Sequence, residues 1–209
     1  NQCAHCNTPL DPNRKTAGCP CKAVNYCGTE CQRAHWKTHK QEHKCLMKAI
    51  KKKAAAATIH VPADCKTLKE AVERVYNDRS LTTIVISKGT HVVERNAQGF
   101  TCVGVPSSMN IIGDPGVSKN EIIILGGFVI TRDVVSKIQG DVHLQNMTVR
   151  HLSKDGFGVI GCSSFTMKDV IVEQCGSFGV LARGTTVVGT CTNVEVRQCG
   201  SSGVYAIEK

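Results

Sequence analysis

The sequence predicts a chain in two parts, a small cysteine-rich finger followed by an all-β solenoid. Seven of the 13 cysteines lie before position 46, in a stretch with several histidines and few aliphatic residues. Toward the C-terminus, short segments rich in Val, Ile and Thr recur at offsets of 23 and 24 residues. Charge divides the chain in the same way: residues 1–57 hold 11 Lys and Arg against 3 Asp and Glu, a net charge of +8, whereas residues 58–209 hold 15 against 14.

The first part offers cysteine and histidine side chains at spacings typical of metal ligands. The candidate ligands are Cys3, Cys6, Cys19, Cys21, Cys27, Cys31, His39, His43 and Cys45. A structural zinc ion takes four such ligands in a tetrahedron, so eight of them are enough for two ions. A segment of fewer than ~50 residues buries too little apolar surface to fold alone, and we expect zinc coordination to supply its folding free energy. Cysteines that lie among histidines at these spacings favour zinc thiolates in a reducing compartment, and they argue against disulfides.

Part of this segment resembles a known family of zinc fingers. The residues that carry the resemblance are Tyr26, Cys27, Cys31, Gln32, Trp36 and His39. Their order and spacing are similar to those of the MYND-type finger, over about residues 3–45. The resemblance implies two structural zinc ions bound in cross-brace order. It assigns Cys3, Cys6, Cys27 and Cys31 to one ion, and Cys19, Cys21, His39 and a last ligand to the other.

The last ligand of the second ion is left open by the sequence. The family usually places a cysteine four residues after the histidine, but that position is His43 here, and Cys45 lies two residues further on. His39 and His43 would share one face of a helix, which favours His43. Cys45 could reach the ion instead if the helix ended first. The second cysteine pair, Cys19-x-Cys21, is also one residue shorter than the family's usual pair.

By resemblance, a finger of this type binds a short, often proline-containing peptide of a partner protein. Gln32 and Trp36 occupy positions that often lie near the peptide groove of the family. Because four ligands are available for each ion, we do not expect a catalytic zinc, which would keep one position open. The basic charge attracts acidic partners. Nucleic acid is not expected, since the spacing of base-reading Cys2His2 fingers is absent.

A Lys- and Ala-rich segment, residues 47–57, separates the finger (1–46) from the second part (58–209). Lys and Ala are strong helix formers, so this segment either extends a finger helix or forms a solvated linker. Residues 58–61 then predict a short strand, and Thr67 with Glu70 forms a capping-box signature at the start of a helix. The apolar residues of that helix fall on one face: Leu68, Ala71, Val72 and Val75.

The repeat predicts the fold of the second part. Similar copies begin at Asn146, Asp169 and Asn193, and a fixed period of this length with β composition is typical of a solenoid. We expect these three residues to occupy a left-handed turn of successive coils. The residues expected to stack inward are Val170, Val172, Val194 and Val196. Cys175 and Cys199 are expected to form a ladder of small buried side chains.

Residues 58–209 also resemble the pectin-lyase-like superfamily, in the initial helix and in the "IVISKGTHVV" stretch that follows it. The resemblance implies a right-handed parallel β-helix with an N-terminal capping helix. Some relatives cleave acidic polysaccharides, which requires carboxylates gathered on one face. Here Glu173 aligns with Arg197, which predicts an ion pair between coils on a solvated face, and we do not expect catalysis. The repeat is still in phase near Lys209, so we expect either that the protein continues beyond it or that the last coil pairs with another partner.

These observations favour an intracellular adaptor, cytoplasmic or nuclear. In this hypothesis two structural zinc ions hold the finger folded, and the finger docks a peptide. The β-helix offers a surface to a second protein or a glycan. Two alternatives remain open: a carbohydrate-active β-helix enzyme with a regulatory finger, and a transcription or chromatin factor. The sequence has no run of 18 apolar residues, so no membrane span is predicted.

Overall fold

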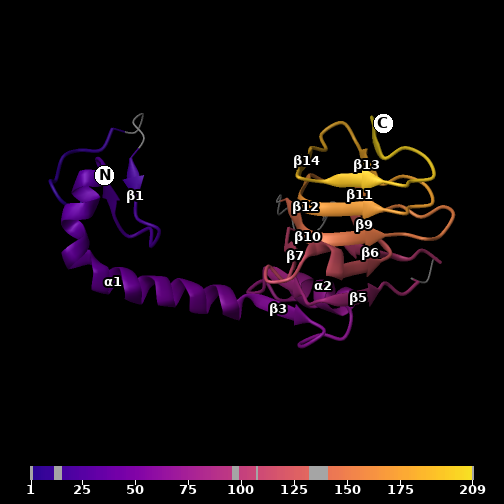
Figure 1. The fold of residues 1–209 in the computed structure, drawn as a ribbon, viewed down its shortest axis with the longest axis horizontal. Helices are drawn as coiled ribbons and strands as arrows, with labels where there is room; N and C mark the ends of the chain where they lie inside the picture. Colours follow the sequence, from indigo (N-terminus) through magenta and orange to yellow (C-terminus); the bar gives the residue numbers. More distant parts are fainter. Residues whose placement is uncertain (1, 12–15, 96–98, 107, 132–140, 209) are drawn as a thin grey trace. The chain divides into compact units, whose positions relative to one another are not determined.

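Figure 1 shows the computed structural model, which describes residues 2–11, 16–95, 99–106, 108–131 and 141–208. The chain divides into two compact units, Asn1–Ala56 and Ala57–Lys209. The boundary falls at the end of the Lys- and Ala-rich segment. The first unit contains the cysteine-rich finger, and the second is a parallel β-solenoid of about five turns.

The finger consists of a small hairpin and one long helix. Strands β1 (Ala17–Gly18) and β2 (Asn25–Tyr26) pair antiparallel, and helix α1 (Thr29–Ala56) follows them. Residues 47–56 are therefore helical and continuous with the finger helix, in keeping with the helix propensity of Lys and Ala. None of the helices in the described part of the chain is long and apolar enough to cross a membrane.

The strands of the solenoid stack in three faces, and every strand pair in them is parallel. The first face contains β3 (Thr58–Val61), β4 (Thr83–Ile86), β7 (Asn110–Gly113), the first halves of β10 (Val142–Arg150) and β12 (Phe165–Glu173), and β14 (Gly189–Thr192). The second contains β5 (Gly89–Val92), β8 (Ile122–Leu125), the second halves of β10 and β12, and β15 (Glu195–Arg197). The third contains β6 (Cys102–Val105), β9 (Gly127–Ile130), β11 (Val159–Gly161), β13 (Val180–Arg183) and β16 (Val204–Ile207). Figure 1 shows β6, β9, β11 and β13 stacked above one another.

The predicted left-handed turn lies between the first and second faces. Asn146, Asp169 and Asn193 have φ values of 56°, 55° and 52°, so the prediction is confirmed. Short polar side chains suit this turn because they hydrogen-bond the neighbouring coil. The Asn146 amide donates to the carbonyl oxygens of Asp114 and Val117 (2.8 and 3.0 Å), and Asn193 donates to Asp169 Oδ1 (2.6 Å).

The interior of the solenoid is a set of apolar ladders. One ladder runs through residues in direct register, Ile59, Ile84, Ile111, Leu144 and Met167, all of which are buried. Val170 and Val172 are buried as predicted, while Val194 and Val196 are partly buried against the same core. Cys175 is buried and Cys199 is partly buried, both as free thiols. Burial raises the pKa of the Cys175 thiol to about 12.

Helix α2 (Leu68–Asn77) lies against the first coils of the solenoid, near β3, β4 and β6. The predicted cap is present, since the Glu70 backbone N–H donates to Thr67 Oγ1 (3.2 Å). The Glu70 carboxylate in turn accepts from the backbone N–H of Lys66 (3.0 Å). The four residues predicted to share one apolar face are all buried: Leu68, Ala71, Val72 and Val75. A short 3-10 helix, η1 (Lys119–Glu121), precedes β8.

The ion pair predicted at Glu173 is present, but its predicted solvated surroundings were wrong. Arg150, Glu173 and Arg197 are in direct register on three successive coils. Glu173 is only 3% exposed, and it accepts from Arg150 Nε (2.6 Å) and from Arg197 Nε (2.7 Å). Burial alone would raise the pKa of this carboxyl, but the two guanidinium hydrogen bonds outweigh burial and lower the pKa below its usual value.

Candidate metal centres and the adjoining groove

Two loops of similar design present the cysteines that precede α1. In the first, the Cys3 backbone N–H donates to the Thr8 carbonyl (2.9 Å), and Asn7 has a left-handed φ of 59°. In the second, the Cys19 N–H donates to the Val24 carbonyl (3.0 Å), and Lys22 has a φ of 60°. Each loop turns the chain sharply enough to direct two sulfur atoms toward the same point.

The first metal centre combines the first loop with the start of α1. Its four members are Cys3, Cys6, Cys27 and Cys31, and their sulfur atoms all lie within 4.8 Å of one another. The Cys6–Cys27 and Cys27–Cys31 sulfur pairs are 3.7 and 3.5 Å apart. A tetrahedral zinc with Zn–S bonds of about 2.3 Å requires sulfur atoms about 3.8 Å apart, so this set of donors fits the ion.

The second metal centre combines the second loop with the middle of α1. Its four members are Cys19, Cys21, His39 and His43, whose ligand atoms also lie within 4.8 Å of one another. Cys21 Sγ is 3.3 Å from His39 Nε2, and Cys19 Sγ is 3.2 Å from His43 Nδ1. These separations suit a tetrahedral zinc, whose bonds to nitrogen are about 2.0–2.1 Å long. The remaining candidate, Cys45, is exposed and belongs to neither group.

A carboxylate orients one of the histidines of the second centre. Glu42 Oε2 lies 3.1 Å from His39 Nδ1, which leaves Nε2 directed at the cysteines. Metal-binding histidines commonly use the other ring nitrogen in this way. Sequence reasoning did not single out Glu42. Its signal was a carboxylate three residues after a ligand histidine, a spacing that places both on one side of a helix.

The pKa values of the thiols are unequal within each centre. The pKa of Cys3 is lowered to about 5, mainly because the Cys6 backbone N–H donates a hydrogen bond to its sulfur. Burial would raise the pKa of Cys21, but hydrogen bonds led by the Ala23 backbone N–H lower it to about 6. The pKa of Cys31 rises to about 12, because its hydrogen bond with Cys27 favours the protonated thiol. Cys3 and Cys21 are thus the members most readily available as thiolates, the form that binds metal.

A groove of about 530 Å³ adjoins the second metal centre. It is lined by Cys19, Pro20, Thr29, Gln32, Arg33, Trp36 and His43. The structure therefore brings the two residues predicted to contact peptide, Gln32 and Trp36, into one groove. Trp36 is 39% exposed, and its indole packs edge-on against the rings of His43 and His39, at 5.1 and 6.4 Å between centroids.

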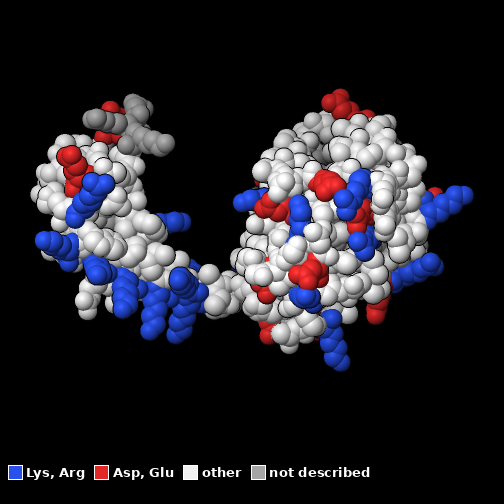
Figure 2. Space-filling model, viewed as in Figure 1, with Lys and Arg blue, Asp and Glu red and all other residues white. Residues whose placement is uncertain are grey.

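Basic side chains follow one side of α1. They recur every three or four residues, and all are exposed: Arg33, Lys37, Lys40, Lys44, Lys48 and Lys51. Figure 2 shows Lys and Arg side chains along this helix. None of the six forms an ion pair with another residue in the described ranges. The charge predicted from composition is thus concentrated on the helix that carries part of both metal centres.

Comparison with known protein families agrees with this geometry. Residues 3–43 match the model of the MYND finger family. No curated protein sequence and no solved structure was found to match the chain. The MYND finger is a zinc-binding module for protein–protein interaction. The segment of residues 3–43 is therefore a MYND zinc finger, with two groups of four candidate ligands that could hold two zinc ions.

Proposed function

We propose that the protein is a non-enzymatic adaptor, located in the cytoplasm or the nucleus, whose finger docks a short peptide of a partner protein. The observation that carries the proposal is the groove beside the second metal centre. It combines an exposed aromatic ring, Trp36, with a side-chain amide, Gln32. Both side chains project from a helix that zinc coordination holds in place.

The chemistry of the groove favours a proline-containing peptide. An extended proline-rich segment loses little conformational entropy on binding, and such segments typically dock against exposed aromatic side chains. Trp36 offers such a surface, and its edge contacts with His39 and His43 hold the ring in position. The Gln32 amide can both donate to and accept from a peptide backbone. The basic side of α1 favours a peptide that carries acidic residues beside its docked segment. We do not propose nucleic acid as a partner.

Peptide display on the full chain tests this function. We expect enrichment of proline-containing peptides, lost in Trp36→Ala and weakened in Gln32→Ala, with zinc content unchanged in both. Thr38→Ala is the matched control, because Thr38 is an exposed residue of the same helix outside the groove. Absence of enrichment, or enrichment that survives Trp36→Ala, would contradict the proposal.

For the last ligand of the second centre we propose His43. Its Nδ1 lies 3.2 Å from Cys19 Sγ, and α1 continues unbroken past Cys45, so the two histidines share one helix face. We expect His43→Ala to lower the zinc content of the purified protein from two ions toward one, and Cys45→Ser to leave it at two. The reverse pattern would assign Cys45 as the ligand.

The solenoid acts, in this proposal, as a rigid scaffold that presents a surface to a second protein or a glycan. Its relation to the pectin-lyase-like superfamily is part of the proposal. The buried carboxylate of Glu173 accepts hydrogen bonds from two arginines. These bonds have a structural role and leave the carboxylate unsuited to proton transfer. A scaffold is thus favoured over an enzyme.

A further inference from the structure

The outer surface of the third face carries a column of four residues whose side chains, where present, have no hydrogen-bonding groups. Gly104, Val129, Ile160 and Leu181 are in direct register on β6, β9, β11 and β13. Strands in a sheet lie about 4.8 Å apart, so the column extends about 14 Å along the solenoid. Residues on either side of each position in the strand point inward, so the side chains of Val129, Ile160 and Leu181 point away from the core, and Gly104 adds no side chain to the column.

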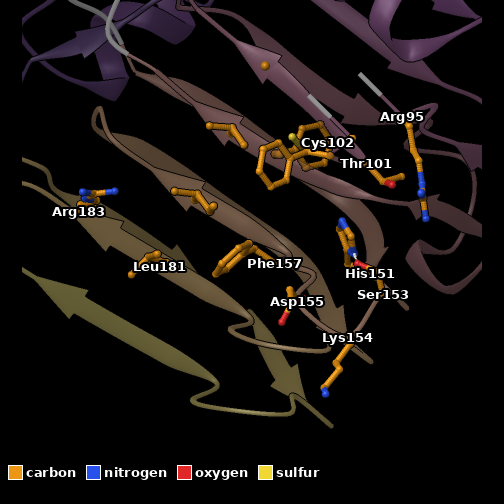
Figure 3. A pocket seen from close by; sticks show the side chains of 16 residues that line it. Arg95, Thr101, Cys102, His151, Ser153, Lys154, Asp155, Phe157, Leu181 and Arg183 are labelled. Carbon is orange, nitrogen blue, oxygen red and sulfur yellow. Dashed lines mark hydrogen bonds between the residues drawn. The ribbon is translucent and has the colours of Figure 1, made fainter. Parts of the chain in front are cut away.

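A groove of about 730 Å³ lies over this column (Figure 3). Its walls include Cys102, Phe157 and the start of the segment that follows β10. Phe157 stacks on Phe178 with ring centroids 5.9 Å apart, and Phe178 stacks on Tyr205 at 5.2 Å. The aromatic stack therefore fixes Phe157, and the groove has the size of a typical ligand site.

The segment that follows β10 forms a closely packed wall. His151 is only 7% exposed, and its Nδ1 lies 3.0 Å from Ser153 Oγ. A Cβ atom at Gly156 would lie 1.8 Å from His151 Nδ1, so only glycine allows this approach. By contrast, the space above Gly104, on the floor of the groove, is open, since an added Cβ would meet no atom within 4 Å. The groove is thus preformed on one side and open above Gly104.

Cationic side chains surround the apolar floor. Arg95, Lys154 and Arg183 line the groove together with a single carboxylate, Asp155. Figure 3 shows Arg183 and Arg95 on opposite sides of Phe157. Within the described part of the chain, none of the three cations is joined to a carboxylate in an ion pair. Three cations against one carboxylate favour an anionic ligand.

We propose that this groove binds an acidic segment of a partner protein that carries a large aliphatic or aromatic side chain. The apolar side chain covers the column above Gly104, and acidic residues on both sides of it face the three cations. A glycan suits the floor less well, because Val129, Ile160 and Leu181 offer no partners to sugar hydroxyls that would lose water there. This site names the second partner's chemistry and does not depend on peptide binding by the finger.

Fluorescence anisotropy with the full, zinc-loaded chain tests the site. The probe is a labelled peptide of sequence EEELFEEE. We expect saturable binding that weakens with added salt. Gly104→Trp, which fills the groove without a clash at Cβ, and Arg183→Glu should each weaken binding about tenfold or more, equivalent to about 1.4 kcal/mol. Lys168→Glu is the matched control, an exposed residue of β12 outside the groove, and should change affinity less than about twofold.

Three further probes separate the alternatives. KKKLFKKK and EEESSEEE should bind at least about tenfold more weakly than EEELFEEE, because each lacks one of the two features. Trp36→Ala should leave EEELFEEE binding unchanged, whether or not the finger binds proline-containing peptides. The proposal is overturned if EEELFEEE binds no tighter than about 1 mM, if Gly104→Trp has no effect, or if Trp36→Ala abolishes binding. Binding of oligogalacturonate in place of the peptide, blocked by Gly104→Trp, would make this a glycan site and also overturn it.

Discussion

The two units of this protein hold their chain in place with different buried residues. In the finger, the buried side chains of the described residues are three cysteines, Tyr26 and His39. In the solenoid they are mainly Ile, Val, Leu, Met and Phe, in ladders that cross the coils. The finger lacks a buried aliphatic core in its described part, so metal bonds must take the place of apolar burial there. We therefore expect the two units to lose their structure under different conditions.

Removal of zinc is expected to have the largest effect and to separate the two units. Zinc binding contributes about 10–16 kcal/mol in isolated zinc fingers, so a strong chelator should unfold the finger. The solenoid contains no group of zinc ligands among its described residues and should keep its thermal transition. Elemental analysis should give two zinc ions before treatment, and circular dichroism should report partial loss of helix after it. A finger that stays folded without zinc would contradict the conclusion that metal bonds take the place of apolar burial in this unit.

A cavity in the solenoid core should have the reverse effect. Leu144 is buried between Ile111 and Met167 in one ladder, so Leu144→Ala should lower the free energy of unfolding of the solenoid by about 2–5 kcal/mol. Zinc content should stay at two ions. The control is Leu152→Ala, an exposed leucine of the same unit, with an expected change within about 0.5 kcal/mol. Equal losses in the two variants, measured by urea denaturation, would show that the ladder is not what stabilises the unit.

Glu173 tests how much a buried charge adds to the ladders. Glu173→Gln removes a carboxylate that accepts from two arginines, and we expect a loss of about 2–3 kcal/mol in the solenoid. Because folding lowers the pKa of Glu173, its contribution is fully present above the usual pKa of about 4.5 and is lost as pH falls through the lower, folded value. Urea denaturation from pH 6 to pH 3 should therefore be less steeply pH-dependent in the variant.

Glu195→Gln is the control for that series. Glu195 is exposed and, among the residues that the structure describes, its carboxylate accepts from Arg197 alone, so its loss should cost less than about 1 kcal/mol. If Glu195→Gln changed the pH dependence as much as Glu173→Gln, burial would not distinguish the two carboxylates.

The smallest expected effect concerns the second metal centre. Glu42→Ala removes the carboxylate that orients His39, and we expect the zinc affinity of this centre to fall about 10–100-fold. The first centre should be unaffected, since its four ligands are all cysteines. Competition with a chromogenic chelator would resolve the two ions. Gln41→Ala, at the neighbouring exposed position, should change neither affinity.

The elements that sequence predicted are those with a local signal. The candidate ligands follow from spacings within 45 residues, their division into two groups from the resemblance to the MYND-type finger, and the capped helix α2 from a motif of four residues. The left-handed turn followed from the repeat, because Asn146, Asp169 and Asn193 are aligned copies. The burial of Glu173 was missed although the signal existed. Arg150 lies 23 residues before Glu173, which is one repeat, so the spacing predicts Arg150 as a second arginine partner of the carboxylate.

The groove on the third face could not be predicted in the same way. Its floor comes from strands of four coils, and two of these coils precede the recognisable copies of the repeat. Its walls come from segments of unequal length between strands, including the one that holds Arg95 and the one that holds Lys154. Side chains so distant in sequence meet only through the register of the sheet.

The coil-to-coil register of the solenoid bears on how such a chain can change over evolutionary time. Strands inside the stack, such as those of β12, pair with the equivalent strand one turn before and one turn after them. Duplication of 23 or 24 codons would thus add one complete layer, about 4.8 Å thick, while older layers keep their buried neighbours. The metal-bound unit has no comparable freedom, because four ligands from separate segments must converge on each ion. Genes of this type can therefore lengthen at one end of the molecule while the other stays constant.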